Sequence, residues 1–215
     1  MADEIAVPEG MPGAPDVELA LSYAKRALAK FTAVRLCLIL PLTLGPVVGV
    51  NLGFFSASVI AVLPILPGLY LLFTAAYRLR YATRLLACRR ILRLYPLVPY
   101  SRVVKKKETG KLYGVVFALR VSTRGQHGAP LMRGLNATGS TKWPAGFEEG
   151  GWVAGDLPYG GVLLSPTAKA MLFIKPDDWG KSEPRRRELG PEREELARRA
   201  GLHDNKWREP MFSMV

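Results

Sequence analysis

Residues 36–77 read LCLILPLTLGPVVGVNLGFFSASVIAVLPILPGLYLLFTAAY and contain no Asp, Glu, Lys, Arg or His. A membrane-spanning helix needs about 20 mostly apolar residues, and this run holds about twice that number. Near its middle, residues 51–58 (NLGFFSAS) form a turn-like cluster of Asn, Gly and Ser. We therefore expect helices over roughly 34–52 and 58–78, because a backbone inside a bilayer must satisfy its own hydrogen bonds. The pattern predicts a two-helix transmembrane hairpin over residues 34–78.

Prolines interrupt the uncharged run at Pro41, Pro46, Pro64 and Pro67. Membrane helices tolerate proline, usually as a kink. The prolines are typical either of a kinked anchor or of a hinge in a transport helix. We favour the anchor, because an ionisable residue within a span is the usual mark of a transport path and both spans lack one.

Basic residues flank the run on both sides, and the turn between the helices has none. Lys and Arg in short flanks mark the cytoplasmic side of a membrane. Before the first helix stand Lys25, Arg26, Lys30 and Arg35. After the second helix stand Arg78, Arg80, Arg84, Arg89, Arg90 and Arg93. The sequence thus predicts a multi-pass protein of the plasma membrane with both termini in the cytoplasm.

The chain has 215 residues with 30 Lys and Arg against 18 Asp and Glu, a net charge of +12, yet 49% of it is apolar. The uncharged run at residues 36–77 excludes an ordinary soluble domain, a disordered chain and a disulfide scaffold. Most of the excess charge lies in residues 78–111, where basic side chains next to a membrane attract anionic lipid. We expect the anionic inner leaflet as the partner of the six arginines after the second helix. An acidic protein partner is the alternative, and nucleic acid is not expected because no recognition motif accompanies the charge.

The segments around the hairpin differ in character. Residues 1–15 are rich in Pro and Gly and predict a flexible N-terminus. Residues 16–33 have the spacing of an amphipathic helix capped by Asp16. This helix is expected either on the inner membrane face or packed against the cytosolic domain. Residues 79–95 predict a basic juxtamembrane helix.

Residues 96–179 predict a small antiparallel all-β domain, a barrel or a sandwich, which makes the chain α+β overall. Short β-branched and aromatic runs alternate with turn residues here, as in Val115–Val121 and Ala170–Ile174. A strand near Leu131–Leu135 interrupts an otherwise loop-like stretch over 123–150. We expect Gly160 or Gly161 to take a positive φ in a turn fixed by Pro158.

Within this domain we single out a motif made of Trp152, Asp156, Gly160, Gly161, Asp177 and Trp179. With these residues, the arrangement of two membrane helices, a basic linker and a β domain is similar to uncharacterised small integral membrane proteins of actinobacteria. The resemblance covers roughly residues 36–180. It implies an architecture and a lineage, and carries no assigned activity.

No pattern of catalytic, metal-binding or cofactor-binding residues stands out. His127 and His203 have no spaced Cys or His partner, so no metal site is predicted. No phosphate-binding loop or nucleophile elbow occurs, so no cofactor is expected. We interpret Asp177 and Asp178 as turn and helix-cap residues, and Cys88 as an apolar filler with acylation as the alternative. Residues 180–215 predict a charged tail with one short helix, either solvated or paired with a partner helix.

These observations favour a non-enzymatic, membrane-anchored interaction or scaffold module that binds a protein partner or its own copies. The alternative is a small transport or channel subunit, which needs several copies to enclose a path because two helices cannot. A hidden enzyme is a third hypothesis, for which Asp156 and His127 would be tested first.

Overall fold

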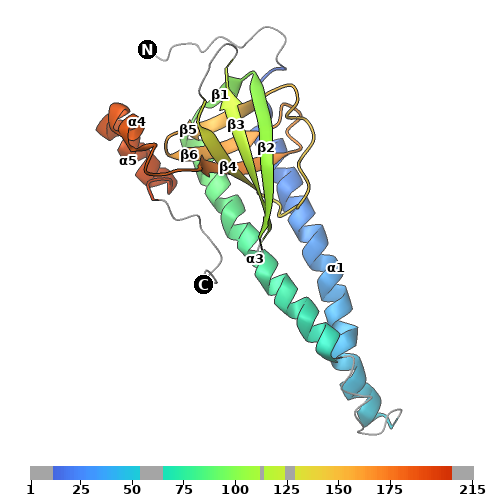
Figure 1. Cartoon of the computed structure of the whole chain (residues 1–215). Helices are drawn as coiled ribbons and strands as arrows, with labels where there is room; N and C mark the ends of the chain where they lie inside the picture. Colours follow the sequence, from blue (N-terminus) through green and yellow to red (C-terminus); the bar gives the residue numbers. More distant parts are fainter. Residues whose placement is uncertain (1–11, 54–64, 112–113, 124–128, 205–215) are drawn as a thin grey trace. The chain divides into compact units, whose positions relative to one another are not determined.

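The computed structural model describes residues 12–53, 65–111, 114–123 and 129–204 (Figure 1). The chain forms two compact units. Unit 1 comprises Met1–Lys25 with Thr83–Val215, and unit 2 comprises Arg26–Ala82. The expected boundaries at 33/34 and 78/79 do not coincide with this division, because helices continue through both positions.

The first helix, α1 (Val17–Asn51), is continuous over 35 residues. Asp16 caps it, since its Oδ1 accepts hydrogen bonds from the backbone N–H groups of Glu18 at 2.8 Å and Leu19 at 3.1 Å. The predicted amphipathic helix over 16–33 and the predicted span from residue 34 are therefore one element. The predicted cap is confirmed, and the helix is continuous through the predicted boundary between residues 33 and 34.

Unit 2 contains the remainder of α1 and the first part of α3 (Ile65–Leu94). The two helices contact each other at Gly68. A Cβ placed on Gly68 would lie only 2.7 Å from Thr43 Cγ2, so glycine allows the two helices to approach closely. Val17–Pro46 is the one described helix long and apolar enough to cross a membrane. The predicted turn at 51–58 falls largely outside the described residues, and the two-helix membrane hairpin stays a prediction.

Unit 1 contains one antiparallel sheet of seven strands in the order β1-β5-β6-β7-β4-β3-β2, curled into a half-barrel (Figure 1). The strands are β1 (Leu97–Tyr100), β2 (Arg102–Lys111), β3 (Gly114–Ser122), β4 (Leu131–Asn136), β5 (Gly151–Asp156), β6 (Gly160–Leu164) and β7 (Met171–Pro176). The antiparallel α+β class and the strand near residue 131 are confirmed. The sheet is neither a closed barrel nor a two-sheet sandwich.

Two apolar cores cover the two faces of the central strands. The inner core lies within the curl of the sheet and includes Phe117, Leu163 and Ile174. The helix-side core joins Phe173 on β7 to buried residues of α1 and α3, including Leu21 and Ile91. Because both faces are covered, every residue of β7 is buried, whereas β4 alternates between buried and half-buried positions. The start of α1 thus packs within unit 1, as one of the two alternatives for residues 16–33 expected.

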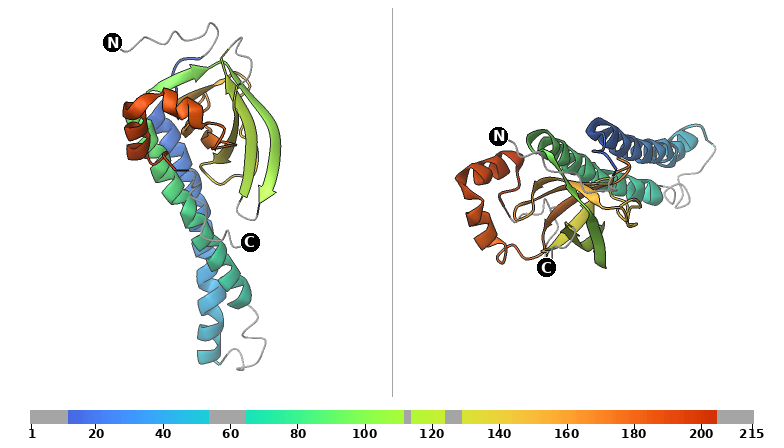
Figure 2. Two further views of the ribbon diagram at one scale, coloured as in Figure 1. Left: turned by 60° about the vertical axis from the view of Figure 1, so that its left-hand side comes forward. Right: turned by 90° about the horizontal axis from the view of Figure 1, so that it is seen from above.

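Two C-terminal helices, α4 (Glu183–Glu188) and α5 (Gly190–Ala200), also belong to unit 1. Figure 2 shows them beside the sheet. Ala197, Ala200 and Leu202 are buried in the helix-side core, and Gly201 ends α5 with φ 76°. The described part of the tail is therefore packed against the domain that the sequence placed at 96–179, because small residues on one side of α5 fit closely against it.

Candidate functional site: a groove at one end of the sheet

A groove opens in unit 1 where several chain segments meet at one end of the strands. Its main lobe has a volume of about 360 Å³, and a second lobe of about 310 Å³ shares Pro130, Ser182 and Arg185 with it. The polar residues of the main lobe are Tyr95, Tyr100, Asp156, Ser182, Arg185 and Arg193, and its apolar residues are Pro96, Val98, Pro130, Leu157, Pro158 and Leu189. A concave site of this size, mostly apolar with a few converging polar groups, is typical of ligand binding.

The turn between β5 and β6 carries Asp156 into the groove. The N–H of Tyr159 donates to the Asp156 carbonyl at 2.8 Å, and the N–H of Gly160 donates to the Leu157 carbonyl at 3.2 Å. Gly160 has φ 103°, and a Cβ there would lie 2.5 Å from the Ile174 carbonyl oxygen. This position therefore requires glycine. Of the two glycines expected to adopt a positive φ, Gly160 is the one that does.

Asp156 is the carboxylate of the groove whose pKa is raised. Its side chain is 13% exposed, and its Oδ1 lies 3.5 Å from Arg193 Nη1. Burial raises the pKa of Asp156, while Arg193 and Tyr95 oppose the rise. Burial and the charge of Asp156 in turn raise the pKa values of Tyr95 and Tyr100. Asp156 is thus held beside one cation in surroundings that only partly stabilise its charge.

Asp156 and Tyr95 interact with each other in the groove, since a hydrogen bond between their side chains opposes the rise of the Asp156 pKa. Apart from this interaction, neither Asp156 Oδ2 nor the Tyr95 hydroxyl oxygen has a hydrogen-bond partner among the described residues. Tyr95 is only 5% exposed, so its hydroxyl is held inside the domain. Buried polar groups are nearly always hydrogen-bonded in folded proteins. The Asp156–Tyr95 pair therefore forms a buried polar site within the apolar walls of the groove.

An aromatic and arginine cluster fixes α4 to the β5–β6 turn. The Arg186 guanidinium carbon lies 3.9 Å from the Trp179 ring centroid, and Nη1 donates to the Trp179 carbonyl at 2.9 Å and the Pro158 carbonyl at 3.3 Å. The Tyr159 and Trp179 rings meet edge to face with centroids 6.4 Å apart. This cluster positions the segment from which Arg185 and Ser182 reach the groove.

A buried lysine holds the end of the described chain. Lys175 on β7 is 1% exposed, and its Nζ donates to the Asp204 carbonyl and lies 3.6 Å from Asp204 Oδ1. Its Nζ also lies 5.4 Å from the Trp179 ring centroid. Burying an ammonium group costs free energy even when it is paired, and removing its partner would destabilise the fold further because the buried charge would be left uncompensated. The pair therefore fixes the segment after α5 against the sheet.

The second lobe of the groove contains two carboxylates that are already paired. Asp177 pairs with Arg133, and Asp178 lies 3.3 Å from Lys181 Nζ and accepts a hydrogen bond from the Lys181 backbone. The predicted turn role of Asp178 is confirmed, whereas the residue that precedes α4 as its N-cap is Ser182. Arg185 lies between the lobes and has no ion pair or hydrogen bond with another described residue. It is therefore the cation of the groove whose charge is least compensated.

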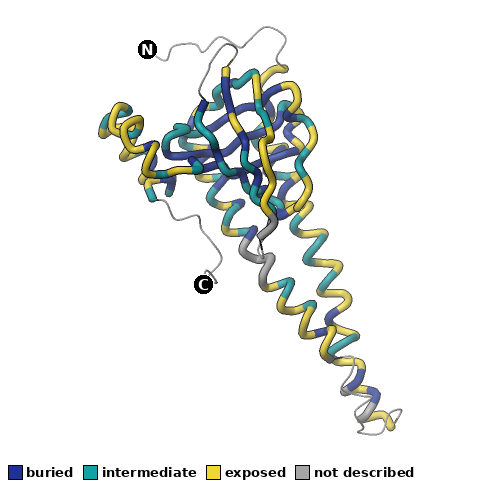
Figure 3. The backbone as a smooth tube through the Cα atoms, viewed as in Figure 1, coloured by how far each residue is buried: buried dark blue, intermediate teal, exposed yellow. Residues whose placement is uncertain are grey.

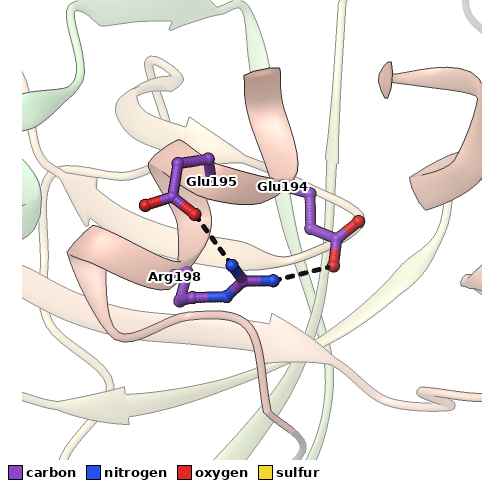
Figure 4. A network of polar contacts seen from close by, with 3 residues as sticks. All are labelled: Glu194, Glu195 and Arg198. Carbon is purple, nitrogen blue, oxygen red and sulfur yellow. Dashed lines mark hydrogen bonds and ion pairs between the residues drawn. The ribbon is translucent and has the colours of Figure 1, made fainter. Parts of the chain in front are cut away.

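The exposed face of α5 carries local ion pairs that are separate from the groove. Arg198 lies 2.9 Å from Glu195 Oε2 and 3.4 Å from Glu194 Oε1 (Figure 4). All three side chains are more than half exposed. Pairs of this kind, three or four residues apart on a helix, stabilise it only slightly. They indicate a solvated helix face.

The structure gathers only part of the predicted motif. Asp156 lines the main lobe and Asp177 the second lobe, whereas Trp179 supports α4 from behind. Trp152 is buried in the helix-side core, and the two glycines serve the β5–β6 turn. The sequence missed Tyr95, Arg185 and Arg193 as groove residues. Their only common signal is that each lies close to a helix end or a proline.

The predicted lipid-contacting arginines lie along α3. Arg90 and Arg93 are exposed, and Arg84 and Arg89 are half-buried. For Arg78 and Arg80 the structure describes the backbone only, so their side chains lie outside the described residues. Cys88 is fully buried, and burial raises the pKa of its thiol to about 12. The acylation alternative loses support, because the reactive thiolate is disfavoured and covered.

Comparison of the chain with models of known protein families, with curated proteins and with solved structures finds no match. The likeness to actinobacterial membrane proteins stays a prediction. Among the described residues, no group of three His, Cys, Asp or Glu side chains is placed to hold a metal ion.

Proposed function

We propose that this protein is a non-enzymatic, membrane-anchored interaction module. The helices of unit 2 anchor it in the plasma membrane with both termini in the cytoplasm. The groove of unit 1 binds a partner at the inner side of that membrane. The arginines that follow the second helix contact anionic lipid.

The membrane part of the proposal rests on exposed apolar side chains in unit 2 (Figure 3). Twelve large apolar residues between 34 and 73 are exposed, with Leu40 at 56% and Phe73 at 65%. A soluble protein rarely exposes a continuous apolar surface of this kind, whereas lipid covers it without cost. The close approach at Gly68 supports a second span, since small residues let membrane helices pack together.

The observation that carries the binding role is the groove itself, in which Arg185 has no ion pair with another described residue and Asp156 and Tyr95 form a buried polar pair. Its side chains suit recognition better than catalysis. Asp177 and Asp178 are held in ion pairs, and Asp156 lies beside Arg193 and Tyr95, whose reactive phenolate form is disfavoured because burial raises its pKa. A general base must reach the proton that it removes, and a nucleophile needs an adjacent base.

Topology is tested with protease-accessible tags at either end of the chain in intact bacterial cells. We expect both tags to be cleaved only after the membrane is opened. A cytoplasmic protein and an external tag serve as controls for the two extremes. Cleavage of the C-terminal tag in intact cells would contradict the proposed orientation.

Binding is tested by site-specific cross-linking from the groove. A photo-cross-linking residue at position 157, on the groove wall, should capture a partner in the membrane fraction. The same residue at position 199, exposed on α5 outside the groove, is the matched control. Equal capture from both positions, or from neither, would contradict a binding role for the groove.

A further inference from the structure

We propose that the groove binds a carboxylate monoanion joined to a compact apolar group, with Arg185 and Arg193 holding the carboxylate. The inference rests on the proposed function and names the chemistry of the partner. Two sources supply such a group: the end of a peptide chain and a free short-chain carboxylic acid.

The charge balance of the groove favours a single negative charge. Arg185 and Arg193 line the main lobe, and Asp156 compensates one of them from 3.5 Å. The charges of the second lobe cancel, because Asp177 pairs with Arg133 and Asp178 with Lys181. One positive charge is left over, and a monoanion neutralises it. A phosphate dianion would place an additional negative charge close to three carboxylates.

The geometry of the arginines also suits a carboxylate. A guanidinium presents a planar fork of N–H donors that matches the two oxygens of a carboxylate. Arg185 keeps all its donors free of other described residues, and among those residues the one polar contact of the Arg193 guanidinium is with Asp156 at 3.5 Å. A ligand carboxylate closer than this would be the better partner for Arg193. Tyr100 lines the same lobe and can donate a neutral hydrogen bond, whereas the Ser182 hydroxyl already donates to the Asp178 carbonyl at 3.0 Å.

The walls of the groove define the rest of the ligand. Pro96, Val98, Leu157 and Leu189 present apolar surface in the main lobe. A volume of about 360 Å³ is at the small end of ligand pockets and suits one side chain or a short alkyl chain. Apolar contact provides affinity here, while the arginines fix the orientation of the charged end.

The test uses the full chain in nanodiscs of phosphatidylcholine, with binding followed by saturation-transfer NMR of the ligand. Four probes share one alkyl chain: hexanoate, hexanamide, hexyl phosphate and hexylammonium. Empty nanodiscs are subtracted. We expect hexanoate to bind most tightly, and each of Arg185→Gln and Arg193→Gln to weaken it by about fivefold. Arg199→Gln, exposed on α5 outside the groove, is the matched control and should leave binding unchanged.

The Asp156→Asn substitution distinguishes most clearly between an anionic and a cationic ligand. If Asp156 competes for Arg193, removing its charge should strengthen hexanoate binding by about threefold. If Asp156 instead recognises a cationic ligand, the same substitution weakens binding and hexylammonium is the preferred probe. Comparing acetyl-leucine with hexanoate then assigns the source, because a preference for the first indicates a peptide end and for the second a free acid.

Preference for hexylammonium or hexyl phosphate over hexanoate would overturn the carboxylate assignment while leaving a binding groove in place. Weaker hexanoate binding by Asp156→Asn would overturn it as well. Absence of binding for all four probes would overturn the assignment too, and cross-linking from position 157 then decides separately whether the groove has a macromolecular partner.

Discussion

Apolar residues do opposite things in the two units of this protein. In unit 1, Leu163 and Ile174 are fully buried between strands. In unit 2, Leu40 on α1 and Phe73 on α3 are more than half exposed. Apolar side chains therefore stabilise unit 1 by leaving water, whereas in unit 2 they stay exposed, as the proposed membrane anchor requires. The apolar residues of the sequence indicate where both units lie in the chain. Their burial in the structure is what distinguishes a packed core in unit 1 from an exposed apolar surface in unit 2.

The largest difference should come from truncating an apolar residue in each unit. Leu163→Ala removes a fully buried side chain and should lower the free energy of unfolding of the sheet by about 2–5 kcal/mol. Leu40→Ala, at an exposed position, should leave it unchanged. Chemical unfolding in detergent, followed by near-ultraviolet circular dichroism, measures both. Equal destabilisation by the two variants would remove the distinction between the units.

Introducing a charged residue into unit 2 tests whether lipid surrounds these helices. Leu40→Asp should oppose membrane insertion by about 2.5–3.5 kcal/mol if the helix spans a bilayer. At an exposed site in water the same change would have little effect. The fraction of protein that resists carbonate extraction from membranes is the measurement, with Leu86→Asp on the exposed face of α3 in unit 1 as control. Unimpaired insertion of Leu40→Asp would contradict a span through α1.

The contact between the two helices of unit 2 can be tested at Gly68. Gly68→Leu places a side chain where Thr43 Cγ2 lies and should cost about 1–3 kcal/mol by overpacking. A disulfide or cross-link between cysteines introduced at positions 43 and 68 should form readily in the parent chain. Gly45→Leu, where a Cβ meets open space, is the matched control. Equal effects of the two substitutions would show that the close approach is unimportant.

The smallest effect is a pH dependence within unit 1. The pKa of Asp156 is raised above 3.8 by burial, so the folded state binds a proton more readily than the unfolded state. Stability contributed by this group is therefore lost as pH rises from 3.8 through its folded pKa. The groups that act on Asp156 are Arg193 and Tyr95, both of which oppose the rise.

The check compares unfolding of the parent chain and Asp156→Asn at pH 4 and pH 7. The parent should gain stability relative to the variant on acidification. Asp178→Asn is the control with opposite sign, because the Lys181 backbone N–H and ammonium lower the pKa of Asp178 and its contribution is lost as pH falls. Identical pH slopes for the two variants would contradict the assignment of Asp156.

Local patterns predicted those parts of the molecule whose cause is local. Asp16 caps α1 because its side chain reaches N–H groups two and three residues ahead. Gly160 adopts a positive φ because a tight turn needs it, and the alternation of β4 follows from one covered face. The groove escaped prediction because Tyr95, Asp156 and Arg193 are far apart in the chain and meet only after the strands have paired.

The sequence by itself determined the membrane-length uncharged run, the basic flanks and the antiparallel β class, since each depends on composition or on residues close together in the chain. Tertiary structure alone decided that α1 continues from unit 1 into unit 2 and that the start of α1 packs in the helix-side core. It also decided that α5 is packed through Ala197 and Ala200, and that Arg185 lines the same groove as Asp156 without an ion pair to another described residue. These outcomes depend on which surfaces pack together in the folded chain. The burial of a side chain, the pKa of a titratable group and the pairing of a charge all follow from that packing.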